Sequence, residues 1–190
     1  YKTVLVDADF IGRSLTHQFG RLREPGLREI VRNGRLNGEV VKLGHPNLNL
    51  LGVGFDRRVS AANLNAGVLR RVIEALREHY DMIIIDTGPI TASIEALPVA
   101  SISDGVVLTL RRGRSRARID ECIADIRGVG ADYLGVVLNN ASRRDCDQYG
   151  STSRTSVQVL AALEANDDEN RPPEASSHPL LGRIDNPSSP

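Results

Sequence analysis

Short apolar runs alternate with polar and amphipathic stretches along most of the chain. Each run is nearly continuous in apolar residues, a pattern typical of strands that are buried on both faces of a parallel sheet. The runs predict five strands, at residues 3–6, 48–53, 82–85, 106–110 and 133–138. We therefore expect a mostly parallel sheet.

Apolar residues recur at three- and four-residue steps between these runs, as they do on the buried face of a helix. One predicted helix carries the stripe at 64–76 and is capped by Ser60, and another carries the stripe at 119–126 and begins after Ser115. Cys122, within the second stripe, is expected to pack rather than react. This alternation predicts an α/β fold with a doubly wound sheet and helices on both faces, whose ligands bind beyond the carboxyl ends of the strands.

Composition separates the end of the chain from the rest. The 190 residues carry 24 bases and 24 acids, but residues 165–190 hold five acids, two bases and five prolines. Such a stretch cannot bury enough apolar surface to offset the entropy of ordering it. We expect one folded domain at 1–150, a terminal helix at 151–165 and a disordered tail at 166–190. A short helix is also predicted at 27–32.

The overall composition excludes several classes of protein. Two cysteines cannot build a disulfide framework, which favours a reducing compartment. No stretch reaches the roughly 18 apolar residues of a membrane span. A net charge of zero gives no general attraction to nucleic acid, so we expect no nucleic-acid partner.

Acidic residues follow two of the predicted strands. Asp7 and Asp9 come after the first strand, and Asp86 comes after the third. Mg²⁺ prefers one or two carboxylates together with water and phosphate oxygens, so acids at strand ends predict a magnesium site. The structural alternative is that each aspartate serves a turn or a helix cap; two such strand ends in one α/β chain favour the functional interpretation.

Two chemistries use a strand followed by Asp-x-Asp. In phosphatases of the haloacid dehalogenase type, the first aspartate is a nucleophile and a downstream lysine and acid pair complete the site. The chain offers Lys42 as its only downstream lysine, and its later strand ends in Asp-Thr-Gly-Pro rather than an acid pair. Nucleotide binding, in which the aspartates hold magnesium and its waters around ATP phosphates, fits better.

An ordered set of segments resembles the deviant-Walker ATPase domain of the bacterial tyrosine kinases of capsule and exopolysaccharide export. Val4-Leu5-Val6-Asp7-Ala8-Asp9-Phe10 resembles their second Walker motif, and the segment 76–87 their Walker B region. The resemblance covers about residues 1–145, and its other parts are Leu50-Leu51-Gly52-Val53-Gly54, Asp104-Gly105-Val106-Val107-Leu108 and Leu134-Gly135-Val136-Val137-Leu138-Asn139. Partition and septum-placement ATPases share this general plan.

The resemblance implies an ATP- and Mg²⁺-dependent protein-tyrosine kinase domain. Asp7 would lie near the magnesium waters and accept the proton of an incoming tyrosine hydroxyl, and Asp9 would support it. Asp86 would orient the metal through a water. Asn139 would approach the adenine edge, although Asn140 and a plain turn role compete for that assignment.

The resemblance also implies the cellular setting. The family works with a membrane polysaccharide co-polymerase, or chain-length determinant, that is fused to the kinase or separate from it. It regulates the polymerisation and export of capsular or exopolysaccharide chains. We therefore expect a homo-oligomer located in the cytoplasm at the inner face of the cell membrane.

The chain departs from the family's pattern in four places. It has no Gly-Lys pair, and the Walker A loop of the family precedes the Asp-x-Asp strand by one strand–loop–helix unit. We therefore expect an N-terminally truncated domain that binds ATP poorly and is inactive by itself. Ile11-Gly12-Arg13 replaces the usual Arg-Arg-Pro, Gly88 replaces a proline and loosens the Walker B turn, and Tyr149 is alone where the family has a tyrosine cluster.

Two other functions stay open. A partition or septum-type ATPase would dimerise on ATP, but such proteins often continue Asp-x-Asp with Pro-Gln, whereas Phe10-Ile11 follows here. A catalytically inactive scaffold of the polysaccharide system would touch its membrane partner through the nucleotide-binding face.

Overall fold

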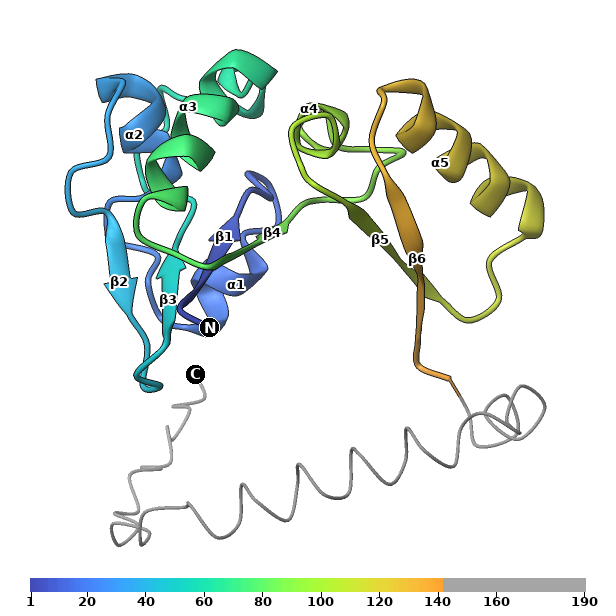
Figure 1. The fold of residues 1–190 in the computed structure, drawn as a ribbon, viewed down its shortest axis with the longest axis horizontal. Helices are drawn as coiled ribbons and strands as arrows, with labels where there is room; N and C mark the ends of the chain where they lie inside the picture. The colour runs from blue at the N-terminus through green and yellow to red at the C-terminus, as the bar shows by residue number, and fades with distance from the viewer. Residues whose placement is uncertain (142–190) are drawn as a thin grey trace, which may run out of the picture. The chain divides into compact units, whose positions relative to one another are not determined.

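The computed structural model describes residues 1–141, of which Tyr1–Asn140 form one compact unit (Figure 1). The helix and tail predicted at 151–165 and 166–190 lie outside the described residues. No helix among residues 1–141 is both long enough and apolar enough to cross a bilayer.

All five predicted strands are present, each within two residues of its predicted ends. Three short elements, β2, α1 and α4, have no counterpart in the prediction, because three to five residues are too few to show a period. In chain order the elements are β1 (Thr3–Asp7), α1 (Ser14–Gln18), α2 (Leu27–Asn33), β2 (Val40–Lys42), β3 (Leu48–Leu51), the 3-10 turn η1 (Ala61–Asn63), α3 (Ala66–Arg77), β4 (Met82–Asp86), α4 (Ala96–Ala100), β5 (Val106–Arg111), α5 (Arg116–Gly128) and β6 (Tyr133–Asn139).

The strands form two hydrogen-bonded groups. Four of them pair in the order β2-β3-β1-β4, and β5 pairs with β6. Strand β1 is parallel to both β3 and β4, and β5 is parallel to β6, whereas β2 runs antiparallel to β3. The parallel arrangement confirms the prediction and brings the carboxyl ends of β1, β3 and β4 to one edge.

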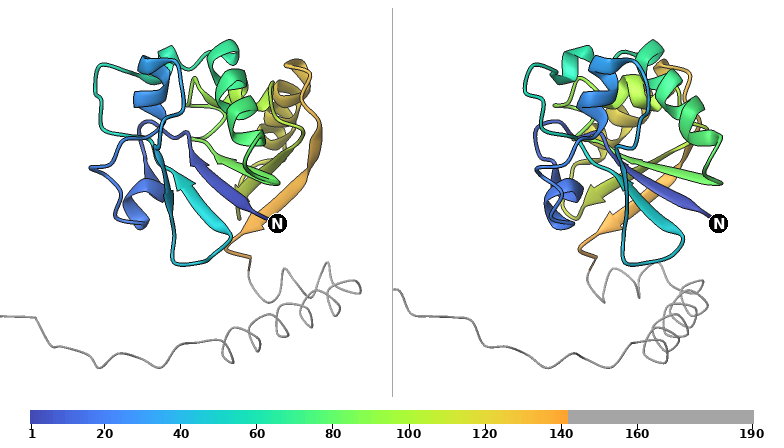
Figure 2. Two further views of the ribbon diagram at one scale, coloured as in Figure 1. Left: turned by 60° about the vertical axis from the view of Figure 1, so that its left-hand side comes forward. Right: turned by 90° about the vertical axis from the view of Figure 1, so that its left-hand side faces the viewer.

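A hydrophobic core lies between the four-stranded sheet and helices α2, α3 and α4. Val4 and Val6 of β1 enter this core together with the predicted apolar stripe of α3. Figure 2 shows α2 and α3 side by side over the sheet. A smaller core around Ile126 of α5 covers β5 and β6. Cys122 is buried, and burial raises the pKa of its thiol, which confirms a packing role.

The opposite face of β4 and β5 is open. Met82 and Ile84 are 44% and 48% exposed, and Val107 is 52% exposed. Leu134 and Val136 of β6 are exposed as well, so the expectation that every strand is buried on both faces is wrong for β4, β5 and β6 within residues 1–141, because helices α3, α4 and α5 cover the other face. In this part of the chain no ladder joins β4 to β5, so each strand has one unpaired edge.

The start of α3 also differs from the prediction. Ser60 precedes η1, and its backbone N–H donates to Asn63 Oδ1 at 2.8 Å. The helix begins only after Asn65, whose side chain accepts the Val68 N–H at 3.0 Å. Ser60 thus caps a 3-10 turn instead of the helix. Helix α5 begins after Ser115 as predicted, and the Ser115 hydroxyl caps it by accepting a backbone N–H at 3.4 Å.

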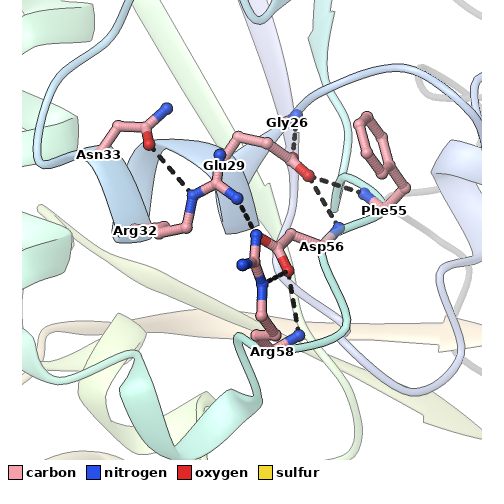
Figure 3. Close-up of polar contacts among 7 residues, drawn as sticks. All are labelled: Gly26, Glu29, Arg32, Asn33, Phe55, Asp56 and Arg58. Carbon is pink, nitrogen blue, oxygen red and sulfur yellow. Dashed lines mark hydrogen bonds and ion pairs between the residues drawn. The ribbon is translucent and has the colours of Figure 1, made fainter.

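A buried carboxylate joins α2 to the loop after β3 (Figure 3). Glu29 accepts the Gly26 N–H on Oε2 at 2.7 Å, and on Oε1 the N–H groups of Phe55 at 3.2 Å and Asp56 at 2.8 Å. Gly54 has φ 88° and lies against this carboxylate, where a side chain would collide with it. One anion therefore satisfies three backbone donors from two segments far apart in the sequence.

Asp56 extends this network. Its carboxylate pairs with Arg32 of α2 and with Arg58, both visible in Figure 3. Hydrogen bonds from the Arg58 guanidinium, the largest cause, hold the pKa of Asp56 well below its usual range. The loop after β3 is thus held to α2 through two acids whose contacts are charge-assisted.

We expect Glu29→Ala to destabilise the fold by about 3 kcal/mol, because it leaves buried N–H groups without an acceptor. The measurement is the free energy of unfolding in urea. Glu74→Ala, at an exposed position of α3, is the control and should change it by less than about 0.5 kcal/mol. Equal effects of the two substitutions would contradict the anchoring role of Glu29.

Candidate functional site

The predicted acids lie at the carboxyl edge of the sheet. Asp7 ends β1 and pairs in register with Asp86, which ends β4. Just beyond this pair the Ala8 N–H donates to the Asp86 carbonyl oxygen at 2.8 Å, which holds the two strand ends together. The parallel ladder therefore brings together acids that are far apart in the sequence.

Asp7 is fully buried and both of its carboxylate oxygens accept hydrogen bonds. Oδ2 accepts the backbone N–H of Thr16 at 2.8 Å and its hydroxyl at 2.7 Å, and Oδ1 accepts the Asp9 N–H at 3.2 Å. The Thr16 hydroxyl in turn accepts the Val53 N–H at 2.9 Å. This chain of hydrogen bonds links the ends of β1 and β3 through the start of α1.

Asp7 has no exposed surface, and its hydrogen bonds are those of a residue that positions its neighbours. The proton-accepting role expected of Asp7 stays a prediction. Sequence reasoning missed Thr16 altogether, since a threonine nine residues after an aspartate gives no local signal.

Asp9 is partly exposed and shapes the loop that follows it. Its Oδ1 accepts the N–H groups of Ile11 at 3.1 Å and Gly12 at 2.7 Å. A side chain added at Gly88 would collide with the Ser93 hydroxyl and lie 3.4 Å from Asp9 Oδ1. Gly88 therefore allows the loop after β4 to fold closely onto Ser93, whereas the sequence interpretation expected this glycine to loosen the turn.

The three aspartates share one electrostatic environment. Burial raises the pKa of Asp86, and the charges of Asp7 and then Asp9 raise it further. The predicted convergence of the three acids is thus present in the structure, while their chemical roles stay predictions. The raised pKa thus reflects burial first and the two neighbouring carboxylates second.

A hard cation fits this arrangement only with help from water or a ligand. Within residues 1–141 no group of three or more His, Cys, Asp or Glu side chains has the geometry to hold a metal by itself. Asp86 is half-buried and Asp9 partly exposed, so both can face a hydrated ion, and Asp7 would act through them. Mg²⁺ commonly binds through one or two carboxylates with waters and phosphate oxygens, so the residues fit it.

Two arginines lie near the Asp9 loop. Arg28 donates to the Phe10 carbonyl oxygen at 3.1 Å, and its guanidinium lies 5.0 Å from the centre of the Phe10 ring. Burial lowers the pKa of Arg28, and the nearby charge of Arg13 lowers it further. The sequence analysis found fewer bases in this loop than the family has, but the fold places Arg28 of α2 beside the loop.

Glu95 is a second residue that sequence reasoning missed. It is fully buried immediately before α4, and neither of its carboxylate oxygens has a hydrogen-bond partner in the structure. An acid in a loop of mixed composition gives no sign of such burial.

Asn139 contacts other residues than the three aspartates. It ends β6, pairs in register with Arg111 and is exposed, and its Oδ1 accepts the Asn140 N–H at 2.8 Å. Asn140 has φ 59°, so the pair forms a turn. The pair has the geometry of the turn that competed with adenine contact, and no hydrogen bond or ion pair within residues 1–141 joins Asn139 to the acids. Adenine contact by Asn139 stays a prediction.

Solved structures define the class of protein. The fold matches the kinase domain of VpsO with a TM-score of 0.66 and 26% identity, covering 74% of this chain and 71% of that one. It also matches the septum site-determining protein MinD of Pyrococcus horikoshii, solved with Mg-ADP, with a TM-score of 0.57 and 20% identity, over 75% of this chain and 59% of that one. The chain therefore has the α/β fold of P-loop nucleotide-binding proteins, as predicted.

Curated relatives narrow the class further. The tyrosine-protein kinase CpsD of Streptococcus agalactiae is 29% identical over 164 residues, which is 81% of this chain and 71% of that protein. EpsB of Ralstonia solanacearum is 30% identical over 93% of this chain, which spans only 24% of the EpsB length. No protein-family model matches the chain. The chain is therefore similar to proteins named as tyrosine kinases, which confirms the resemblance found in its sequence.

We expect Asp86→Asn to stabilise the protein at neutral pH. The folded state binds the Asp86 proton more tightly than the unfolded chain, so stability falls as the pH rises from the ordinary value of 3.8 through the raised pKa. Asparagine does not titrate, and the variant should gain on the parent across this interval and keep its advantage above it. Urea unfolding at several pH values measures the difference.

The matched control is Asp132→Asn, which removes one charge from an exposed position before β6. It should follow the parent at every pH. An Asp86→Asn protein that is less stable than the parent at pH 7 would show that the three carboxylates do not repel one another.

Thr16→Val should cost about 2 kcal/mol of stability, because it keeps the shape but removes both hydroxyl hydrogen bonds. Thr16→Ser keeps the hydroxyl and loses one methyl group, so it should cost about 1 kcal/mol or less. Urea unfolding compares the two. A serine variant as unstable as the valine variant would assign the role of Thr16 to packing.

Proposed function

We propose that the chain forms part of an ATP-dependent protein-tyrosine kinase that regulates the polymerisation and export of capsular or exopolysaccharide chains. The observation that carries the proposal is the meeting of Asp7, Asp9 and Asp86 at the carboxyl edge of a parallel sheet. The homology of the chain to proteins named as tyrosine kinases supports phosphoryl transfer to tyrosine as the reaction at this acidic edge.

Each aspartate receives a separate role in this proposal. Bound Mg²⁺ and ATP would supply charge neutralisation and the phosphoryl group to be transferred. Asp86, half-buried and with a raised pKa, would orient the ion through a water. Asp9, which is partly exposed, would accept the proton of the tyrosine hydroxyl. Asp7, held by Thr16, would fix Asp9 through the hydrogen bond between them.

The aspartates alone do not make a complete ATP site, because they do not bind the phosphate groups. The sequence has no Gly-Lys pair, and β4 and β5 each have an unpaired edge. We propose that activity requires a strand, a phosphate-binding loop and a helix in addition to residues 1–141, and that the strand pairs with β4.

The proposed partner is a membrane polysaccharide co-polymerase or chain-length determinant. Support comes from the relatives: ExoP of Rhizobium meliloti, 22% identical over 165 residues, is named as a succinoglycan biosynthesis transport protein. A homo-oligomer at the inner face of the cell membrane belongs to the same proposal.

The test joins the chain at Tyr1 to the strand, phosphate-binding loop and helix of a related kinase. With radiolabelled ATP, Mg²⁺ and a glutamate–tyrosine copolymer as acceptor, we expect label on tyrosine. Asp9→Asn and Asp86→Asn should each lower the rate by about 100-fold or more, as loss of a general base or metal-orienting group does. Asp132→Asn should leave it within twofold.

Three results would count against this function. ATP hydrolysis without phosphotyrosine would favour a partition- or septum-type ATPase. A folded protein that neither binds nor hydrolyses ATP would favour an inactive scaffold. Phosphotyrosine that persists in Asp9→Asn would remove Asp9 from the reaction.

A further inference from the structure

A groove of about 350 Å³ lies between helices α2 and α3, which run side by side over the sheet (Figure 2). We call it the α2–α3 groove. It belongs to the compact unit Tyr1–Asn140, and none of the three aspartates of the acidic edge lines it. Its floor is apolar and consists of Ile30, Val31, Leu36, Val68, Val72 and Ala75.

The apolar floor is recessed. Ile30 and Val72 are buried members of the hydrophobic core, and Val31 and Leu36 pack against that core while staying partly exposed. A bilayer is entered by apolar side chains that protrude from a surface, which these do not. A recessed apolar surface instead receives apolar side chains from a binding partner.

The rim of the groove is basic. Arg35 comes from the α2 side, directly after Gly34, where the backbone turns with φ 74°, and Arg71 comes from α3. Both arginines are exposed, and neither makes a hydrogen bond or an ion pair with residues 1–141. Glu78 is the one acid among the residues of this part of the chain that line the groove. The two sides of the groove thus each offer a guanidinium group without an acidic partner.

The walls of the groove select the kind of partner. Both walls are helices, whose backbone groups bond within the helix, so a partner strand cannot pair with them. The lining residues include no Phe, Tyr or Trp, which proline-rich segments and nucleic-acid bases require for stacking. The remaining common mode is a partner helix that lays its apolar face into the groove.

The size of the groove agrees with this mode. A cavity of about 150 Å³ holds one benzene molecule, so 350 Å³ has room for about two apolar side chains. An amphipathic helix places two such side chains on one face when they are three or four residues apart. Acidic residues beside them would then meet the basic rim.

We infer that the α2–α3 groove is a docking site for an amphipathic, acidic helix of a partner protein. Two apolar side chains of the partner, one helical turn apart, rest on the floor of the groove. Carboxylates that flank them pair with Arg35 and Arg71, and this charge complementarity gives the complex its orientation and part of its association rate. The inference does not depend on the reaction at the acidic edge.

A phage-displayed library of short helical peptides, with leucine fixed at two positions four residues apart and the flanking positions randomised, tests this inference. Selection on the full chain should enrich Asp and Glu at the flanking positions. The most enriched peptide is then synthesised with a fluorescent label, and its affinity is measured by fluorescence anisotropy.

Arg35→Glu/Arg71→Glu should weaken binding of this peptide at least tenfold, because attraction at the rim becomes repulsion. The matched control, Arg114→Glu/Arg118→Glu, changes the net charge equally at exposed positions outside the groove and should change the affinity by less than twofold. A peptide with lysine in place of its acids should bind the Arg35→Glu/Arg71→Glu protein more tightly than the parent. Thermal unfolding verifies that both double variants are folded.

Ala75→Leu tests the floor of the groove without changing any charge. The larger side chain occupies part of the space, so we expect at least a tenfold loss of peptide affinity. If this variant does not fold, the two double variants and the lysine peptide decide the question. Asp86→Asn should leave peptide binding unchanged, which separates the groove from the proposed kinase function.

Several outcomes would overturn the inference. These are a selection that yields no binding peptide or no enrichment of acids, equal losses in the two double variants, and unchanged affinity in folded Ala75→Leu. Self-association of the parent that Arg35→Glu/Arg71→Glu abolishes, measured by sedimentation, would assign the groove to a second copy of the chain. Binding of dodecanoate with the same arginine dependence, in the absence of peptide binding, would assign it to a small amphiphile.

Discussion

The hydrogen bonds around the Asp7 carboxylate set the geometry of the whole acidic edge. A buried anion is costly unless its oxygens are satisfied, and here Thr16 and the Asp9 N–H satisfy them. Through the Thr16 hydroxyl, the same contacts reach the Val53 N–H and so define where β3 lies relative to β1. The position of each acid at this edge follows from that one desolvated group.

Anchoring and repulsion act together at this edge. Asp7 is held rigidly, whereas Asp86 lies in register beside it with a raised pKa because burial and two like charges oppose its ionisation. A site that keeps uncompensated charge gives up stability for the capacity to hold a cation. The proposed division of labour, with Asp7 positioning and the more accessible acids reacting, follows from this difference in solvation.

The sequence predicted the strands well because buried parallel strands leave long apolar runs, and it predicted that Asp7, Asp9 and Asp86 meet because parallel strands share a carboxyl edge. It did not predict Thr16, Arg28 or Glu95, whose positions depend on how loops close. The start of α3 was misplaced because Ser60 and Asn65 are both good cap residues and only the 3-10 turn between them decides which one is used.

The network of Glu29 and Asp56 is another feature that the sequence pattern could not predict. Glu29 is the third residue of α2 and forms a capping box with Gly26, but this local motif does not predict its bonds to the Phe55 and Asp56 N–H groups, which connect α2 to the loop after β3. Long-range contacts between a helix and a loop leave no periodic signal in the sequence, so only the folded chain reveals them.

The open edge of β4 has a consequence for how the protein behaves in concentrated solution. Within residues 1–141, β4 has one unpaired edge and exposed apolar side chains such as Met82 and Ile84, so it can act as a template for any extended chain. The β4 strand of a second molecule can compete for the position that a native neighbour would fill. Self-association through this edge should therefore grow with concentration, and solubility depends on how completely the edge is capped.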